Sequence, residues 1–345
     1  MPLIAHNNLP TYERLKQEGQ VVLPRDFARR QDIREIHIGL LNMMPDAALE
    51  ATERQFYRLI GGSNQIAQFY IHPFTLDSIQ RSEKAQNHID HYYEHFNEIK
   101  LSGLDALIIS GANVTHANLE QEVFWQQLIE VVDWATESVT STLTSCLATH
   151  AVMQFRYQQK RQPLSYKRWG VYQHQVINSH PLVNDVNNQF DVPHSRYNEI
   201  SEIQFKQAGL KILVASEQAG VHLATSEDGF KIIFFQGHPE YDVISLLKEY
   251  KREVFLARQD PQKTYPPFPE HYLNQQAKAI LNEYAYRQLA TDFPEKLITK
   301  RLKNTWHDTA EAIVGNWIGL VYQITHPQRH IPYMEGVDIL NPLNL

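Results

Sequence analysis

One cysteine, Cys146, occupies the junction between two different patterns in the chain. The β-branched run at 139–144 favours a strand, and the apolar spacing at 148–157 favours a helix. The free N–H groups and the dipole at the start of a helix stabilise a thiolate, and the amide of Leu147 could donate to an oxyanion. A lone cysteine is more often a buried apolar residue, so the prediction of a nucleophile depends on a partner elsewhere in the chain.

A histidine and a glutamate follow an apolar run elsewhere in the chain and could activate that thiol. The run at 232–235 reads Ile-Ile-Phe-Phe, and His238 and Glu240 come after it, separated by Pro239. Side chains two apart in an extended segment share a face, and the residue before a proline is biased towards extended geometry. Glu240 can therefore orient the imidazole while the imidazole activates the thiol. This predicts a Cys–His–Glu group for acyl transfer through a thioester.

The composition restricts the kind of protein that carries these residues. The chain has 345 residues, of which 43% are hydrophobic and 21% charged, as in ordinary soluble globular proteins. Its net charge of −7 argues against a dedicated nucleic-acid binder. A single cysteine excludes an internal disulfide, so we expect a reducing, cytoplasmic environment. Because no apolar run approaches the roughly 18 residues that span a bilayer, we expect no membrane segment.

Alternating strand and helix patterns must position the catalytic candidates. The expected strands lie at 36–41, 66–74, 104–112, 139–144, 170–176, 211–215 and 231–235, with the last two joined by a hairpin turn at Asp228-Gly229. The expected helices lie at 47–60, 123–135, 148–157, 244–258, 271–290 and 309–324. This order predicts an α/β fold with a doubly wound, mostly parallel sheet flanked by helices. We expect an N-terminal arm (1–32), one catalytic domain (33–330) with a helical elaboration at about 270–330, and a C-terminal tail (331–345).

Three further polar clusters are less specific. Residues 193–197 read Pro-His-Ser-Arg-Tyr and are expected to form a loop, either gripping a small polar substrate or lying on the surface. The charged run at 248–253 is typical of a solvated helix face, although one arginine on it could hold a carboxylate. The histidines at 88, 91 and 95 have helical spacing but lack the pattern of a known metal site. We therefore predict no metal ligands.

At this point several motifs, taken in their order along the chain, resemble those of one family, the homoserine O-succinyltransferases. They are Leu-Leu-Asn-Met-Met-Pro at 40–45, Ser-Gly-Ala at 110–112, Val-Thr-Ser-Thr-Leu at 139–143, Gly-Val-Tyr at 170–172, Pro-His-Ser-Arg-Tyr at 193–197, Gly-His-Pro-Glu-Tyr-Asp at 237–242 and Val-Tyr-Gln-Ile-Thr at 321–325. The resemblance implies a flavodoxin-like fold similar to that of class I glutamine amidotransferases, with a C-terminal helical extension. It also implies a ping-pong transfer of an acyl group from acyl-CoA to L-homoserine in methionine biosynthesis. No tightly bound cofactor is implied, and the family suggests a homodimer.

Matching positions carry the family's residue roles onto this chain. Cys146 would carry the acyl thioester, His238 would accept the proton, and Glu240 would orient the His238 imidazole. The resemblance further implies residues that contact the substrates: Lys167 and Ser195 for substrate binding, Arg252 for the homoserine carboxylate and Thr115 for the choice of acyl donor. Succinyl-CoA is the expected donor.

The chain also departs from the family pattern at several positions. Leu147 replaces the usual Trp after the nucleophile, His150 replaces a Gln, and Thr115 stands where Gly or Glu is typical. Acetyl-CoA as donor and serine as acceptor therefore stay open. A glutamine amidotransferase or γ-glutamyl hydrolase would use the same three residues but usually has glycines on both sides of the cysteine. A catalytically silent homologue that binds or regulates is the third alternative.

Overall fold

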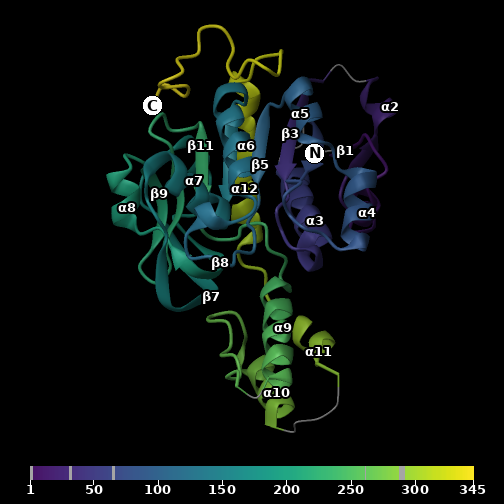
Figure 1. Ribbon diagram of the computed structural model, residues 1–345, viewed down its shortest axis with the longest axis vertical. Helices are drawn as coiled ribbons and strands as arrows, with labels where there is room; N and C mark the ends of the chain where they lie inside the picture. Colours follow the sequence, from purple (N-terminus) through teal and green to yellow (C-terminus); the bar gives the residue numbers. More distant parts are fainter. Residues whose placement is uncertain (1–2, 31–32, 64–66, 261, 287–291) are drawn as a thin grey trace.

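The chain folds around one large sheet, seen in Figure 1 behind its helices. A computed structural model describes residues 3–30, 33–63, 67–260, 262–286 and 292–345. In these residues the sheet has eleven strands in the order β2-β1-β4-β3-β5-β6-β11-β10-β9-β7-β8. All pairings from β2 to β11 are parallel, and those from β11 to β8 are antiparallel. The prediction of an α/β fold with a mostly parallel sheet is confirmed.

The parallel strands are short, and all except the edge strand β2 are mostly buried, as expected for strands covered on both faces. They are β1 (Leu3–Ala5), β2 (Val22–Pro24), β3 (Glu35–Leu41), β4 (Gln68–Phe74), β5 (Ala106–Ile109), β6 (Ser141–Ser145) and β11 (Ile232–Phe235). The antiparallel strands are β7 (Gln162–Val176), β8 (Gln189–Glu199), β9 (Lys211–Ser216) and β10 (Gly220–Thr225).

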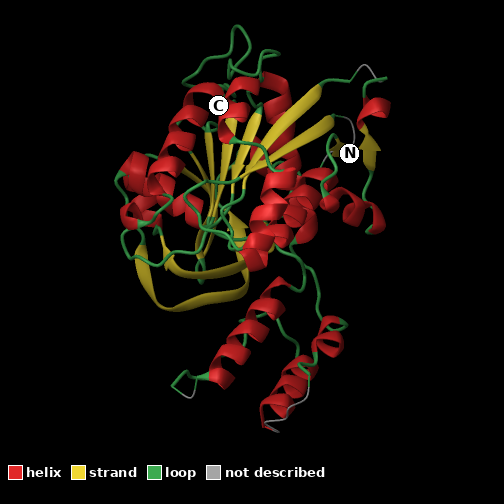
Figure 2. Ribbon diagram, turned by 45° about the vertical axis from the view of Figure 1, so that its right-hand side comes forward, coloured by secondary structure: helices red, strands yellow, loops and turns green. Residues whose placement is uncertain are grey.

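Helices cover both faces of the sheet (Figure 2). On one face, α1 (Pro10–Gln17), α3 (Asp46–Gly62) and α12 (His307–Ile324) share a core with alternate strand residues such as Ile108 and Leu143. On the other, α5 (Phe96–Ser102), α6 (Trp125–Ser138), α7 (Leu147–Tyr157) and α8 (Glu202–Gln207) share a second core to which Leu107 and Ile109 belong. The remaining elements of the sheet layer are α2 (Arg25–Ala28), α4 (Glu83–Tyr92), η1 (Leu119–Gln121) and η2 (Pro181–Val183). The sheet is therefore doubly wound.

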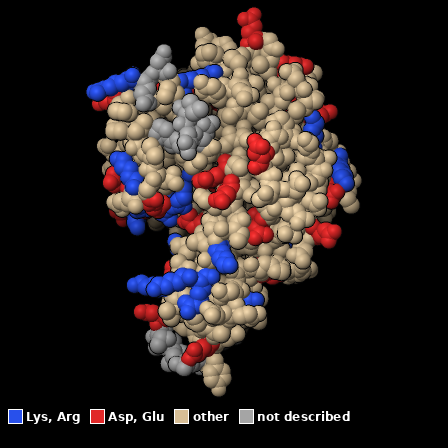
Figure 3. All heavy atoms as spheres, turned by 180° about the vertical axis from the view of Figure 1, so that it is seen from behind, with Lys and Arg blue, Asp and Glu red and all other residues tan. Residues whose placement is uncertain are grey.

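A helical lobe projects from the sheet layer at the bottom of Figure 1. It consists of α9 (Ser245–Gln259), α10 (Gln275–Tyr286) and α11 (Glu295–Thr299). A separate apolar cluster joins Leu247, Tyr250 and Trp306 of this region to Trp169 on β7. Figure 3 shows basic side chains gathered over this lobe on the back of the molecule, with acidic ones among them. Within the described ranges, no helix is long and apolar enough to cross a membrane.

Three expectations about the elements need correction. Residues 193–197 are not a loop but part of β8, where Pro193 is tolerated because β8 lies at the sheet edge. The hairpin turn at Asp228-Gly229 follows β10, an unexpected strand, because β10 lies between β9 and β11 in the sheet. The histidines at 88, 91 and 95 do not share one helix, since α4 ends at Tyr92 and His95 caps α5.

The predicted arm contributes structure to the sheet layer. Residues 3–28 supply β1, β2, α1 and α2, and β1 pairs with β4 at Leu3 and Phe69. Ile66 and residues 287–290 of the expected elements lie outside the described residues. The division of the chain at residues 32 and 330 stays a prediction.

Candidate active site

Cys146 sits on a tight turn between β6 and α7. Its backbone has φ 51° and ψ −105°, a conformation that costs energy for a residue with a Cβ. Hydrogen bonds hold the turn, because the Cys146 N–H donates to the Phe235 carbonyl at 2.8 Å and the Thr149 hydroxyl to the same oxygen at 2.8 Å. The thiol is half-buried. The Leu147 N–H lies in the first turn of α7, where the helix offers it no acceptor.

His238 reaches the cysteine because β11 and β6 pair in parallel. Phe235 lies opposite Ser145, so both strands deliver their next residues to the same carboxyl edge. His238 Nδ1 and Glu240 Oε1 are 2.7 Å apart, and both side chains are buried. Burial alone would lower the pKa of His238, but the charges of Cys146 and Glu240 and the hydrogen bonds to them raise it well above 6.5. The imidazole therefore bridges the thiol and the carboxylate.

Groups from other elements complete the surroundings of the thiol. A Cβ built on Gly111, after β5, would lie 3.8 Å from Cys146 Cβ, so its backbone passes close to the nucleophile. Two guanidinium groups, Arg161 and Arg196, interact electrostatically with Cys146. Burial lowers the pKa of Arg196 to about 10 against the opposing effect of Cys146. Arg196 belongs to the polar cluster at 193–197 for which the sequence offered substrate binding as one interpretation. Sequence reasoning did not name Gly111 or Arg161 as site residues, although the Ser-Gly after an apolar strand was a usable signal for Gly111.

Glu249 on α9 joins two of the predicted substrate residues. The Ser195 hydroxyl donates to its Oε2 at 2.6 Å, and Lys167 Nζ lies 3.3 Å from the same oxygen. The Tyr241 hydroxyl donates to Oε1 at 2.8 Å, and the Tyr241 ring stacks on His238 with centroids 4.2 Å apart. Burial would raise the pKa of Glu249, but Lys167 and the two hydroxyl donors lower it. The expectation of a solvated face at 248–253 is thus wrong at Glu249.

The other two predicted substrate residues lie further out. The side chain of Arg252 is 62% exposed and bonds Glu253 at 3.1 Å, one turn along α9 from Glu249. Thr115 is exposed in the loop after β5. Its N–H donates to Glu122 Oε1 at 2.7 Å, and its hydroxyl lies 3.0 Å from His116 Nδ1. Neither residue is drawn into contact with the Cys–His–Glu group.

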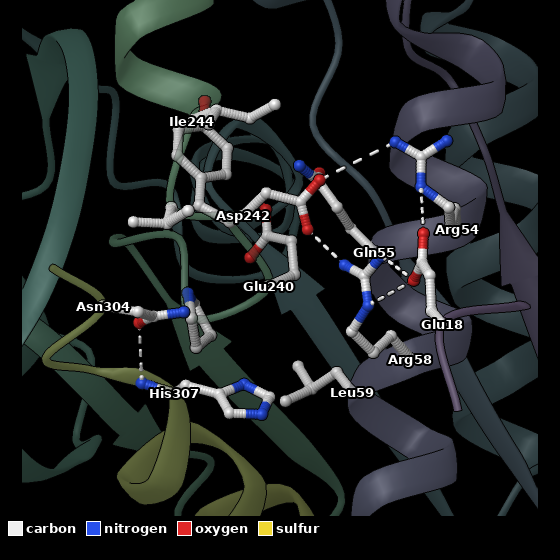
Figure 4. Close-up of a pocket in the computed structure, with 13 residues that line it drawn as sticks. Glu18, Arg54, Gln55, Arg58, Leu59, Glu240, Asp242, Ile244, Asn304 and His307 are labelled. Carbon is white, nitrogen blue, oxygen red and sulfur yellow. Dashed lines mark hydrogen bonds and ion pairs between the residues drawn. The ribbon is translucent and has the colours of Figure 1, made fainter. Parts of the chain in front are cut away.

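A cavity of about 390 Å³ borders the loop that carries Glu240 (Figure 4). On its wall, Arg54 and Arg58 of α3 lie between Glu18 and Asp242 and pair with both. Arg58 contacts Asp242 two residues after Glu240, so this ionic network ties the loop to α3 and to the end of α1. The arrangement holds the carboxylate end of the Cys–His–Glu group in place.

A cysteine on a strand–helix turn, next to a buried histidine–carboxylate pair at the carboxyl edge of a doubly wound sheet, defines the class of α/β proteins with a Cys–His–Glu triad. A family model described as homoserine O-succinyltransferase matches residues 2–327. The chain is 61% identical to the homoserine O-succinyltransferases of Thiobacillus denitrificans, over 100% of both chains, and of Allochromatium vinosum, over 100% of this chain and 99% of the other. A solved glutamine amidotransferase from Thermotoga maritima matches with a TM-score of 0.43 and 9% identity, over 84% of this chain and 98% of that one. The chain belongs to the homoserine O-succinyltransferase family, and the resemblance read from its motifs is confirmed.

Proposed function

We propose that this chain transfers a succinyl group from succinyl-CoA to the hydroxyl of L-homoserine, in methionine biosynthesis. One observation carries the proposal: Cys146 is hydrogen-bonded to His238 of a buried His238–Glu240 pair. The chain that holds this group is similar in sequence to its relatives over its full length. Both half-reactions are acyl transfers, and a thiolate suits them because the donor and the enzyme intermediate are thioesters.

In the first half-reaction Cys146 Sγ attacks the carbonyl carbon of succinyl-CoA. The Leu147 N–H donates to the developing oxyanion, and the Gly111 backbone lies beside Cys146. The bond between the carbonyl carbon and the CoA sulfur breaks, and the imidazolium of His238 gives its proton to that sulfur. The products are succinyl-Cys146 and free CoA.

In the second half-reaction His238 acts as general base. With Nδ1 bonded to Glu240, Nε2 faces the thiol side and accepts the hydroxyl proton of homoserine. The hydroxyl oxygen attacks the thioester and the Cys146 thiolate leaves. Ser195 and Lys167 would hold the acceptor, the carboxylate of Glu249 matches its ammonium group, and Arg252 would pair with its carboxylate.

Several finer points belong to the same proposal. Thr115 would leave room for the succinyl carboxylate, which a glutamate there would repel. We infer no tightly bound cofactor, no nucleic-acid or membrane partner, a homodimer and a cytoplasmic location.

The test separates this function from the alternatives left by the sequence. The purified chain is mixed with succinyl-CoA or acetyl-CoA, and intact-mass and peptide spectra locate any adduct. A succinyl group on Cys146, discharged by homoserine and lacking in Cys146→Ala, supports the proposal. Discharge by serine alone, an acetyl adduct alone, or glutamine hydrolysis would each assign a different function, and no adduct with any donor would indicate a silent homologue.

A further inference from the structure

A second group of reactive side chains lies at the other end of the sheet from the antiparallel strands. His6 follows β1, His72 belongs to β4 and Glu94 precedes α5. One nitrogen or oxygen from each lies within 4.8 Å of the other two. The Glu94 N–H donates to the Pro73 carbonyl at 2.9 Å, which fixes this glutamate against β4. We call these three residues the N-terminal cluster.

The hydrogen bonds around the cluster leave one ring nitrogen without a partner and place another beside the carboxylate. His6 Nδ1 lies 3.2 Å from the Ile4 carbonyl and 3.2 Å from the Tyr12 hydroxyl. Because the carbonyl can only accept, a hydrogen bond to it puts the proton on Nδ1 and leaves Nε2 with a lone pair. That Nε2 is buried and has no hydrogen-bond partner among the described residues. His72 Nε2 lies 2.8 Å from His37 Nδ1, while its Nδ1 faces Glu94 Oε1 at 2.6 Å. The contact with Glu94 places a proton on His72 Nδ1. A metal ion that replaced this proton would bind the Nδ1 lone pair, and His72 Nε2 would then donate to His37.

Such an arrangement is typical of metal-binding histidines, which donate their other ring N–H to a neighbouring acceptor. Two imidazole nitrogens and a carboxylate oxygen suit Zn²⁺. Two carboxylates lie in this region, Glu94 in the cluster and Glu35 at 3.3 Å from His37 Nε2. The nearby positive charges are Arg25, which is exposed, and Arg329, which is partly exposed.

We propose that the N-terminal cluster binds one Zn²⁺ ion through His6, His72 and Glu94, with solvent as the fourth ligand. Ligand bonds of about 2.0–2.2 Å at a tetrahedral ion separate their donor atoms by roughly 3.3 Å. The His72–Glu94 contact would therefore open slightly as the ion replaces the proton between them. Bound in this way, the ion would tie residue 6 to β4 and stabilise the contribution of the N-terminal segment to the sheet. The inference does not depend on the proposed acyl transfer.

The test uses the full chain carrying Cys146→Ser, so that the thiol cannot bind metal. After treatment with EDTA, CoCl₂ is titrated while visible absorption is recorded, ZnCl₂ is used in competition, and Tm is measured with and without ZnCl₂. We expect one equivalent of Co²⁺ to bind and to be displaced by Zn²⁺, with a rise in Tm. His72→Gln and Glu94→Gln should each weaken binding by roughly 100-fold or more, and His91→Gln, an exposed histidine on α4, should leave it unchanged.

Two outcomes would overturn the proposal. One is the lack of saturable binding near one equivalent in the parent protein. The other is equal affinity for Co²⁺ in the parent and in Glu94→Gln. Because Gln keeps the shape of Glu, this variant stays informative even if circular dichroism shows that His72→Gln is unfolded.

Discussion

The contact between His238 and Glu240 can be tested by replacing Glu240 with Gln, which keeps the side-chain shape and removes the charge. The 2.7 Å hydrogen bond between them is buried. A buried hydrogen bond to a charged group contributes about 1.5–3 kcal/mol, which corresponds to roughly 10- to 150-fold in rate. The amide can also offer its N–H to Nδ1, which would put the imidazole proton on Nε2 and block its action as a base. We therefore expect kcat to fall by about 10²- to 10⁴-fold.

The assay follows loss of the thioester absorbance of succinyl-CoA with homoserine present, and Glu137→Gln, at an exposed glutamate near the end of α6, serves as the control. Because Glu240 helps to raise the pKa of His238, an NMR titration should show the imidazolium of the variant losing its proton at lower pH than in the parent. A loss of kcat smaller than about tenfold, with the His238 titration unmoved, would refute the assigned role of Glu240.

Four other changes have defined outcomes. Cys146→Ala should abolish turnover with Tm nearly unchanged, and residual acyl transfer would contradict a thioester intermediate on Cys146. Thr115→Glu should lower kcat/KM for succinyl-CoA relative to acetyl-CoA; an unchanged ratio would remove Thr115 from donor selection. Glu249→Gln should raise KM for homoserine by about tenfold or more yet still allow acylation of Cys146 in mass spectra, whereas lost acylation would place Glu249 in the first half-reaction. Burial lowers the pKa of His150 to about 3, so its contribution to stability is complete above pH ~6.5 and is lost as pH falls towards 3. The slope of unfolding free energy against pH, measured by urea unfolding, should be smaller in His150→Gln by about 1.4 kcal/mol per pH unit between pH ~6 and ~4. An unchanged slope would contradict the assignment of this pH dependence to His150.

The core of the site could be predicted because strand ends are readable in a sequence. A β-branched run followed by Cys146 and an apolar run followed by His238 were enough, since parallel strands bring their carboxyl ends to one edge. The pairing of β6 with β11 itself is a long-range fact that no local pattern contains.

Other parts could not be predicted for physical reasons. Glu249 belongs to a run of charges that resembles a solvated helix face, and only the packing of α9 beside Ser195 and Tyr241 buries it. Strand β8 contains Pro193 and several polar residues, so its extended state depends on the long pairing with β7 rather than on its own propensity. Strand β1 has three residues, too few for a periodic signal.

The register between β6 and β11 also limits how sequences of this kind can diverge. Inserting or removing one residue within β11 would turn every later side chain to the opposite face of the strand and displace the imidazole by about 3.3 Å. Surface loops can change length, but β6 and β11 must each keep their length for Cys146 and His238 to stay in contact. Deletion scanning across 232–235 should therefore give inactive proteins even where the fold survives.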